Sequence, residues 1–449
     1  MTTLLMLATT AALAVDVNWF ASIEGDTSSD LTTGWDVVAS GGAAWVGGDF
    51  DTELTVGGTT VTSFGLDDVY IAKYSGSGSP LGVFSFGSDN NDHMYGLAPH
   101  PDGGVVAIGT FVTPIDIDGT SYTTTGSADV WIVRLNASGS VVFAKTVGSP
   151  GYDYPYAIDV DPVGNIVVTG QFAGSANLDG LTSRHEGGRD AFVWKLDSSG
   201  NTLWVRTIGG AEDDIGRDVV VGPNNNVYVV GQYRATATTD DGNAVSSAGE
   251  EDIFVASLTP AGVTRWLRSA GGPAEDRARA LAIGNDTELY FAGEIDDDAL
   301  FGTTSVAAPL VDTMYAAAVD PATGALAWVN GSDATGEVNG LTLVHPTLLV
   351  MSGAFSGPAT FDTVSLTNQG GRDGYLVGVD TATGAYTKGV GFGGPGEDWF
   401  KRVYGEPGRN VFFATGAYSS DGAVFDQYTT SAFGPTDGVV MELPRAQFR

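Results

Sequence analysis

One register of this sequence carries side chains that could bind a ligand. Most of its members lie three residues after an acid that ends a short loop, and the other members follow by alignment. The register consists of Trp35, Tyr95, Tyr156, Arg217, Arg279, Asn339 and Lys401. Planar rings and cations are suited to a sugar or to a carboxylate. The alternative is that these side chains only pack on their neighbours or pair with nearby acids.

Two acidic clusters could bind a hard cation. The first is Glu212, Asp213 and Asp214, and the second is Asp296, Asp297 and Asp298. Calcium takes several oxygen ligands from such loops. Neither segment has the full spacing of a calcium loop, so two interpretations stay open: one or more Ca²⁺ sites, or solvated acids.

Signals for catalysis are poor. The four histidines, His93, His100, His185 and His345, fall at unrelated places in the sequence. No nucleophile elbow, zinc-binding helix motif or phosphate loop is present. Carboxylates from distant segments could still meet as a glycosidase pair, but in so acidic a chain that pattern is unspecific.

The chain repeats itself, and the repeat positions these residues. A Gly-x-aromatic or Gly-x-aliphatic strand end recurs every 60 to 63 residues, at Gly48, Gly109, Gly170, Gly231, Gly293, Gly353 and Gly416. An Asp that opens a β-rich run recurs in step, at Asp68, Asp129, Asp190, Asp252, Asp312, Asp373 and Asp437. A period of about 61 residues with four strands per unit predicts an all-β fold, a seven-bladed β-propeller of four-stranded antiparallel blades.

One unit shows the expected order of strands. Alternation and β-branched residues predict strands over 156–160, 165–172, 190–196 and 202–208, with tight turns after the first and the third. The recurring Asp is expected to accept hydrogen bonds from turn amides rather than to bind metal. Trp19, Trp204, Trp266 and Trp328, with Phe143 in the same register, are expected to pack between blades.

The two ends of the chain are out of phase with the blades. Residues 18–24 read as the fourth strand of a blade, whereas the C-terminus stops after a third strand, residues 437–443. We therefore expect the N-terminal strand to join the C-terminal blade and close the ring, since closure removes free sheet edges.

The two faces of such a ring differ. The segments between the second and third strands reach about eighteen residues and vary strongly. They lie on the same face as the connections between blades, where the aromatic and cationic register enters the central channel. We expect any binding site on that face.

Composition limits location and partners. Acids outnumber bases 54 to 20, a formal charge of −34, which disfavours nucleic acid and anionic membranes as partners. Cysteine is absent.

Residues 4–14 form a short apolar run that ends in a small-x-small site, so residues 1–14 read as a signal peptide, or else as a buried or frayed first segment. No other stretch could cross a membrane, and residues 15–449 form one propeller domain.

The unit that runs from Gly209-Gly210-Ala211-Glu212-Asp213-Asp214 through Asp218 to Gly222–Gly231 resembles the bacterial SBBP-type β-propeller repeat. The resemblance covers residues 15–443 and implies a propeller fold and a secreted, periplasmic or cell-surface location. It brings no catalytic residues. Residues 319–328 also resemble the tryptophan-docking motif of quinone-dependent dehydrogenase propellers, which we interpret as a shared solution for one turn.

Three classes of function remain open. The first is a binding or interaction module for glycan or protein ligands on the face with the long segments. The second is a hydrolase or lyase that acts on extracellular polysaccharide at the channel mouth. The third is a structural surface component. Fold analogy does not choose among them.

Overall fold

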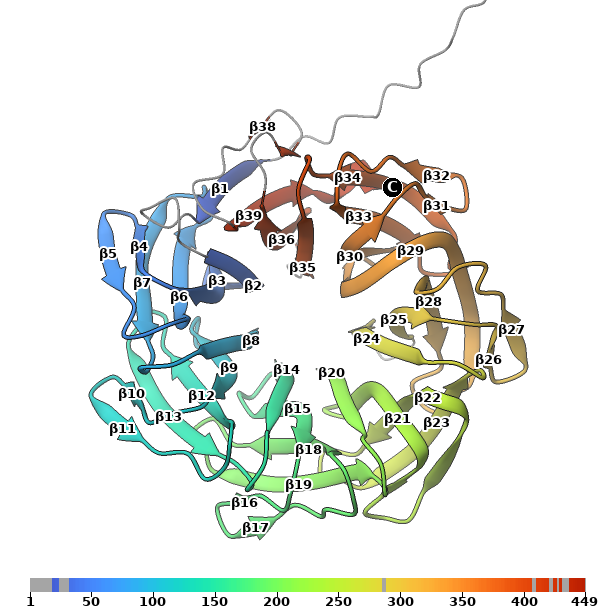
Figure 1. Ribbon diagram of the computed structural model, residues 1–449, viewed down its shortest axis with the longest axis horizontal. Coiled ribbons are helices and arrows are strands. Elements are labelled where there is room, and N and C mark those ends of the chain that lie inside the picture. Colours follow the sequence, from blue (N-terminus) through green and yellow to red (C-terminus); the bar gives the residue numbers. More distant parts are fainter. Residues whose placement is uncertain are drawn as a thin grey trace, which may run out of the picture.

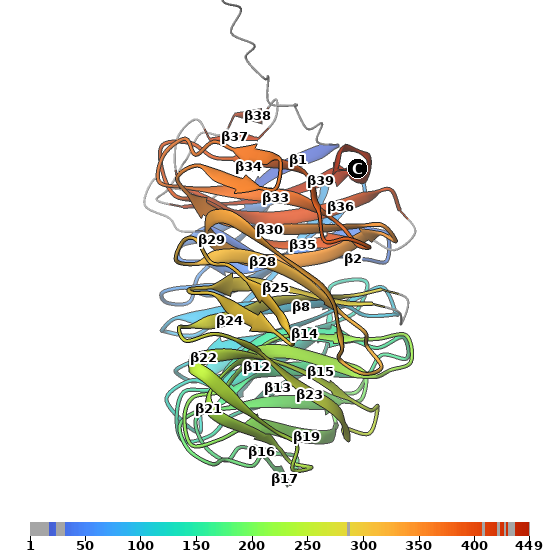
Figure 2. The ribbon, with the colours of Figure 1, turned by 90° about the vertical axis from the view of Figure 1, so that its right-hand side faces the viewer.

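The computed structural model describes residues 18–23, 32–284, 288–405, 409–419, 423–425, 428–429 and 436–448. The predicted signal peptide, residues 1–14, lies outside the described residues. The described chain is all-β apart from one 3₁₀ helix, η1 (Arg445–Phe448), and no helix in it is long and apolar enough to cross a membrane. Antiparallel four-stranded sheets stand around a central axis in the manner of a propeller (Figure 1). Figure 2 shows the ring edge-on.

Each sheet has an inner strand, two middle strands and an outer strand (Figure 1). The inner strands are β2 (Thr32–Ser40), β8 (Asp92–Pro99), β14 (Tyr154–Val160), β20 (Ile215–Val221), β24 (Asp276–Ile283), the second half of β29 (Leu326–His345) and β35 (Asp398–Gly405). The second strands are β3 (Ala43–Phe50), β9 (Val105–Phe111), β15 (Ile166–Phe172), β21 (Val227–Thr239), β25 (Leu289–Ile295), β30 (Leu348–Ser356) and β36 (Val411–Tyr418). The third strands are β6 (Asp68–Ser75), β12 (Asp129–Leu135), β18 (Asp190–Leu196), β22 (Ala244–Leu258), β28 (Thr313–Val319), β33 (Arg372–Asp380) and β39 (Asp437–Pro444). The outer strands are β1 (Trp19–Ile23), β7 (Pro80–Phe86), β13 (Val141–Val147), β19 (Thr202–Gly209), β23 (Thr264–Gly271), the first half of β29 and β34 (Tyr386–Phe392).

The predicted order of strands within a unit is confirmed. Strands β14, β15, β18 and β19 fall within two residues of the four predicted ranges and pair in that order, all antiparallel. The middle strands are buried on both faces, which is why they read as continuous apolar runs. Facing sheets share these side chains as a core between them.

The long segments between second and third strands are not open loops. Each folds into a hairpin at the periphery of the ring (Figure 1). These hairpins are β4 (Glu53–Val56) with β5 (Thr59–Thr62), β10 (Ile115–Ile117) with β11 (Thr120–Tyr122), β16 (Asn177–Leu178) with β17 (Leu181–Thr182), the distal halves of β21 and β22, β26 (Ala299–Phe301) with β27 (Thr304–Val306), β31 (Ala359–Phe361) with β32 (Val364–Leu366), and β37 (Val424–Phe425) with β38 (Tyr428–Thr429).

These peripheral hairpins support the preceding sheet. Strand β21 pairs with outer strand β19, Ile208 opposite Thr239, and β26 pairs with β23, Ala270 opposite Phe301. Ile115 is fully buried in the same role beside outer strand β7. The extra length therefore covers outer edges that would otherwise be open to pairing. Ligand binding on this face of the ring stays a prediction.

The outer-strand aromatics pack between sheets, as predicted. Trp204, Trp266 and Trp328 each lie against the positive-φ glycine in the third-to-fourth-strand turn of the next sheet, Gly262, Gly324 and Gly384. Their indole N–H groups donate to backbone oxygens of those turns, at 3.0 Å to Pro260, 3.1 Å to Pro321 and 2.8 Å to Thr381. Trp19 and Phe143 meet Gly78 and Gly200 in the same way. Residues 319–328 thus contain a turn on which a tryptophan of the preceding sheet packs.

The Asp that opens the third strand accepts hydrogen bonds from turn amides, as predicted, at Asp68, Asp129, Asp190, Asp252 and Asp373. Asp190 accepts from Glu186 N at 2.9 Å, Asp252 from Ala248 N at 2.7 Å and Asp373 from Gln369 N at 2.6 Å. Each of these aspartates lies near an aspartate at the start of the inner strand of the next sheet. Asp190, for example, lies near Asp214.

The assignment of Asp312 to this series was wrong by one residue. Thr313, not Asp312, opens β28 opposite Ile295, as Asp190 opens β18 opposite Phe172. The Thr313 hydroxyl, 2.6 Å from Leu310 O and 3.3 Å from Leu310 N, replaces the carboxylate. Asp312 is half-buried instead and faces Arg277 at 3.8 Å.

Strand β1 pairs antiparallel with β39, Trp19 opposite Glu442, so residues from both ends of the chain share one sheet.

Strand β29 departs from the pattern of the other strands, because it runs without a break from the outer position of one sheet to the inner position of the next. The segment around Gly331 is shorter than its counterparts and leaves no loop between the two.

Candidate functional site

The aromatic and cationic register marks one structural position, the β-bulge of the inner strand. In each inner strand the pairing with the second strand skips one residue, from Gly34 to Asp36, for example, and from Gly216 to Asp218. The skipped residues are Trp35, Tyr95, Tyr156, Arg217, Arg279, Asn339 and Lys401. A bulge re-aims the extra side chain. All seven predicted residues therefore occupy equivalent places around the axis, and all are half-buried.

Five of these residues, one from each of five neighbouring sheets, form a continuous arc. The Lys401 ammonium lies 4.7 Å from the centre of the Trp35 ring. Trp35 is 6.2 Å from Tyr95, and Tyr95 is 5.7 Å from Tyr156, edge to face. The Arg217 guanidinium lies 4.7 Å from the Tyr156 ring. We call this set the mouth arc: three rings in succession with a cation at each end.

The other two register residues are engaged differently. Arg279 Nε donates to Glu294 at 2.7 Å, and the coulombic attraction of that carboxylate raises the pKa of Arg279. Asn339 donates to the backbone oxygen of Phe400 at 3.1 Å. Arg279 thus pairs with a nearby acid and Asn339 with a backbone oxygen, and ligand binding by either residue stays a prediction.

In three sheets the residue x of the Gly-x-aromatic or Gly-x-aliphatic strand end accepts a hydrogen bond from the bulge residue. Asp49 accepts from Trp35 Nε1 at 2.6 Å, and Gln232 accepts from Arg217 Nε at 2.9 Å. In the sheet of Lys401 this residue is Ala417, which offers no acceptor. The sequence contained this signal, since x is polar in the sheets of Trp35, Arg217 and Arg279 and alanine in those of Asn339 and Lys401.

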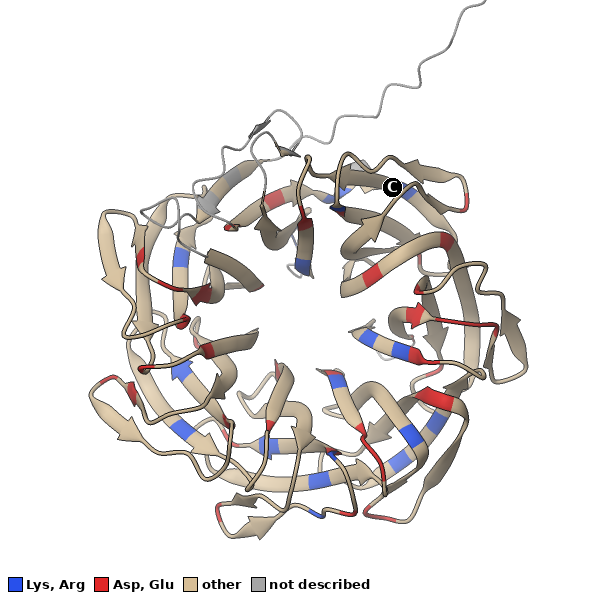
Figure 3. Ribbon diagram, viewed as in Figure 1, with Lys and Arg blue, Asp and Glu red and all other residues tan. Residues whose placement is uncertain are grey.

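Sequence reasoning missed the residues two positions before the bulge, which alternation places on the same side. Tyr154 stacks on Tyr156 at 6.2 Å, and Trp399 lies 5.8 Å from the Lys401 ammonium. On the opposite side of the mouth Arg277 pairs with Glu251 at 3.4 Å, and Glu337 pairs with Arg372 at 2.8 Å. The mouth thus has an aromatic side and a side of paired charges. Figure 3 shows basic residues at the inner ends of β20, β24 and β35.

His93 also occupies this earlier position. Its Nδ1 lies 3.1 Å from Asp49 Oδ2, and hydrogen bonding to that carboxylate raises the pKa of His93. Asp49 is buried and also accepts from Met94 N at 2.8 Å. This is the geometry of a histidine oriented by an aspartate. His100 follows the far end of the same strand, β8, whereas His185 and His345 lie in other sheets. Each of the three has other partners, so the histidines do not cluster.

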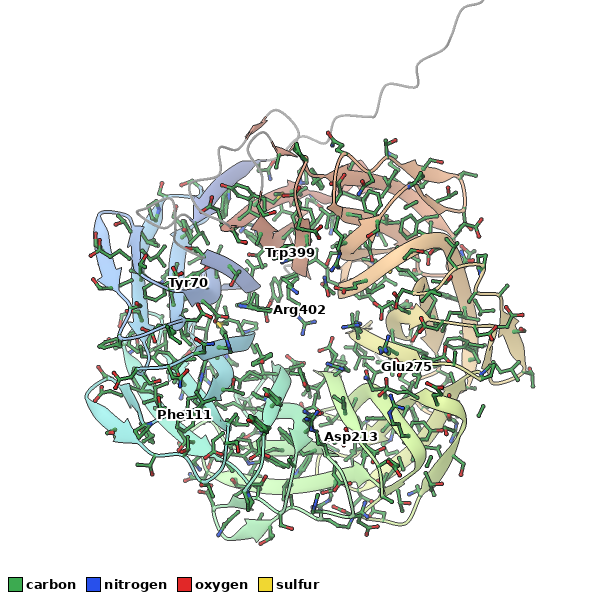
Figure 4. All side chains as sticks on the ribbon, in the orientation of Figure 1. Tyr70, Phe111, Asp213, Glu275, Trp399 and Arg402 are labelled. Atoms are coloured by element: carbon green, nitrogen blue, oxygen red, sulfur yellow. The ribbon has the colours of Figure 1, made fainter. Side chains whose placement is uncertain are left out.

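A cavity of about 660 Å³ lies along the axis beyond the bulge residues, toward the turns between inner and second strands. Arg402, which Figure 4 shows near the centre of the ring, lines it with Asp36, Asp159 and Asp218. Asp218 lies 3.4 Å from Arg402 and accepts from Leu281 N of the next sheet at 2.8 Å. Asp36 and Asp159 bind Leu97 N and Val221 N of their next sheets in the same way. These acids tie inner strands together.

Most acids of the two predicted cation clusters accept hydrogen bonds from backbone amides. Asp214 is buried and accepts from Gly210 N at 2.7 Å, whereas Asp213 accepts from Arg189 N at 2.9 Å. Glu212 is exposed. Asp296 accepts from Asp312 N, and Asp298 from Ala308 N. Across the described residues, no group of three or more His, Cys, Asp or Glu side chains could hold a metal ion. Calcium binding stays a prediction, which calorimetry with Ca²⁺ and a chelator tests.

Comparisons with known proteins find similarity to repeat proteins of the propeller type. No family model matches the chain. It is 27% identical over 170 residues to an uncharacterized WD repeat-containing protein of Acanthamoeba polyphaga mimivirus, which covers 34% of this chain and 12% of that protein. It is 28% identical over 131 residues to regulatory protein FlaEY of Caulobacter vibrioides, covering 28% and 14%. The match thus spans less than a sixth of either relative.

Solved structures with a similar arrangement cover nearly the whole chain at low identity. The Pan2 WD40 domain of Neurospora crassa is 10% identical, with 95% of this chain and 97% of that chain covered and a TM-score of 0.48. BamB from Moraxella catarrhalis is 12% identical, with coverage of 95% and 97% and a TM-score of 0.41.

Proposed function

We propose that this chain is an exported seven-bladed β-propeller of the SBBP type that binds extracellular glycan at its channel mouth. The repeat period of about 61 residues and the pairing of β1 with β39 support a seven-bladed ring closed by the N-terminal strand. The apolar run in residues 4–14 supports export to the periplasm, cell surface or medium.

The mouth arc carries the proposal. Aromatic rings that are half-buried and held by packing present flat apolar faces at small entropic cost, and sugars stack on such faces. Trp35, Tyr95 and Tyr156 are fixed by their ring contacts and by the Asp49 hydrogen bond. The peripheral hairpins are engaged in covering sheet edges, so the mouth is the better candidate than the rim.

A glycan array on the purified protein, with Tyr95→Ala and Tyr156→Ala variants, tests this function. We expect a restricted set of glycans to bind and both variants to lose that binding, because each removes one ring of the platform. Val163→Ala, an exposed turn residue on the opposite face, serves as the control and should bind as wild type. Unchanged glycan binding in both tyrosine variants would contradict a mouth site. Capture of a protein ligand with no glycan bound would favour the protein-binding alternative.

The His93–Asp49 pair favours one second candidate, a polysaccharide lyase or hydrolase at the same mouth. A histidine oriented by a buried carboxylate can exchange a proton with a bound substrate. Release of shorter products from a bound polysaccharide, abolished by His93→Gln, would support the enzyme over the binding module. A structural surface component, the third class, requires neither activity nor binding.

A further inference from the structure

The two cations at the ends of the mouth arc differ from the other basic residues around it. Arg234, Arg277, Arg279, Arg372 and Arg402 each form an ion pair with a carboxylate. Among the described residues, no carboxylate forms an ion pair with Arg217 or Lys401. Both are half-buried and lie on aromatic rings. In a chain with 54 acids and 20 bases, two such unpaired cations at one site need an explanation.

The ionisation of these groups agrees with the contacts. Burial lowers the pKa of Arg217 and lowers that of Lys401 to about 8. The pKa of Arg279, two sheets from Lys401, is instead raised by its partner Glu294. Burial of a cation without a partner costs free energy. An anionic ligand would supply the missing charge at both ends of the arc.

We propose that the mouth binds an acidic oligosaccharide, one that contains uronic acid, whose carboxylates pair with Arg217 and Lys401. The proposal rests on the glycan-binding function above and specifies the class of sugar. The planar guanidinium of Arg217 matches a carboxylate in shape, and its Nε donates to Gln232, which fixes the orientation of the group. The rings of Trp35, Tyr95 and Tyr156 between the two cations would stack on the sugar faces.

The overall charge of −34 makes this pairing selective. The field of the molecule repels anions that make no specific contact, so an acidic sugar binds only where cations are concentrated. A neutral sugar of the same shape would gain the stacking but leave both cations unpaired, and would bind more weakly.

The test is calorimetric titration of the whole protein with a panel of uronic acid trisaccharides and the methyl esters of the same sugars. The ester keeps the shape and removes the charge. We expect at least one acid to bind about tenfold or more tightly than its ester, as charge-assisted hydrogen bonds predict. Arg217→Gln and Lys401→Gln should each remove most of that ratio while the affinity for the ester stays the same.

Two matched controls exist in the chain. Lys73 lies 4.6 Å from the ring of Trp45, and Arg206 lies 5.6 Å from the ring of Trp204. Each is a cation on an aromatic ring, as Lys401 and Arg217 are, but at the opposite end of the blades. Lys73→Gln and Arg206→Gln should leave the acid-to-ester ratio unchanged. Equal binding of every acid and its ester by the wild-type protein would overturn the acidic-sugar proposal and leave glycan binding intact. Failure of all acids, esters and arrayed glycans to bind would overturn both.

Discussion

One extra residue per inner strand determines the chemistry of the mouth. The bulge turns Trp35, Tyr95, Tyr156, Arg217 and Lys401 to one side, where they contact one another across sheets. The residue x of Gly-x-aromatic then decides whether a bulge residue has a partner. Asp49 and Gln232 provide an acceptor, whereas Ala417 leaves Lys401 without one.

The charge of Lys401 makes ligand binding depend on pH. Burial lowers its pKa to about 8, so the ammonium is charged below pH 8 and neutral above it. We expect the affinity for an acidic trisaccharide to fall as pH rises from 7 to 9. Lys401→Arg, which stays charged throughout this range, should flatten the profile. A wild-type affinity that is the same at pH 7 and pH 9 would show that Lys401 does not contact the ligand.

The register of the mouth residues followed from the repeat, because equivalent positions in repeated units must lie at equivalent places around the axis. The side-chain contacts of these residues did not follow from the repeat. Whether Arg217 would pair with an acid, as Arg279 does with Glu294, depends on a strand about fifteen residues away, and spacing alone does not give side-chain direction. Tyr154 and Trp399 gave no periodic signal, because the type of the residue two positions before the bulge varies from unit to unit.

The elements are held together by contacts that repeat from sheet to sheet. Outer-strand aromatics dock on the next sheet's turn, and buried aspartates join third strands to the next inner strands. The sequence predicted both series, since both recur with the period. It did not predict the peripheral hairpins, whose short strands carry too few residues to be distinguished from loops before their pairing partners are known.

Trp266 tests the docking contact. It is buried and donates to Pro321 O at 3.1 Å. Trp266→Ala should cost about 3–5 kcal/mol of unfolding free energy, because it removes a large buried ring and leaves a cavity. Urea denaturation measures this. Val263→Ala, at a half-exposed residue of the adjacent turn, should change it by less than about 0.5 kcal/mol. Equal effects of the two substitutions would contradict the docking role.

The aspartate pairs at the sheet junctions predict a stability that falls with rising pH. Burial, and to a smaller extent the Asp190 carboxylate, raises the pKa of Asp214 to about 8, and burial raises those of Asp92 and Asp276 to about 7. A raised folded-state pKa favours the protonated folded protein. This contribution is complete below pH 4, the range in which the unfolded acids titrate, and is lost as pH rises through 7 to 8.

Thermal melting of wild type and Asp214→Asn measures this effect. Asparagine resembles the protonated acid, so we expect similar melting at pH 5 and a higher melting temperature for the variant at pH 8. Asp197→Asn is a control of opposite sign: burial raises the Asp197 pKa slightly, but hydrogen bonds from Asn201 and Ser199 lower it overall. A wild-type melting temperature that rises from pH 5 to pH 8 would contradict the prediction.

For the whole molecule, strand β1 connects the two ends of the chain. Its backbone pairs with β39 over five residues, and Trp19 packs on Tyr74 and Phe413 from two different sheets. The offset of the chain ends against the repeat was enough to predict this partner. The sequence did not reveal that β29 would cross between sheets without a break.

Deletion of residues 15–24 should destabilise the whole ring, because it exposes the edge of β39 and removes one docked tryptophan. We expect a lower melting temperature and concentration-dependent aggregation in differential scanning calorimetry with light scattering. Deletion of residues 1–14 is the matched control and should leave both unchanged. If the variant that lacks residues 15–24 has the same melting temperature as the full-length protein, the closure of the ring by β1 is wrong.

The central claim is that the mouth arc is a binding site for acidic glycan. A crystal structure of the protein with the tightest uronic acid trisaccharide tests it most directly. We predict sugar rings stacked on Trp35, Tyr95 and Tyr156, with carboxylates within hydrogen-bond distance of Arg217 and Lys401. Sugar bound at the peripheral hairpins or in the axial cavity beside Arg402, with the mouth arc empty, would contradict the claim.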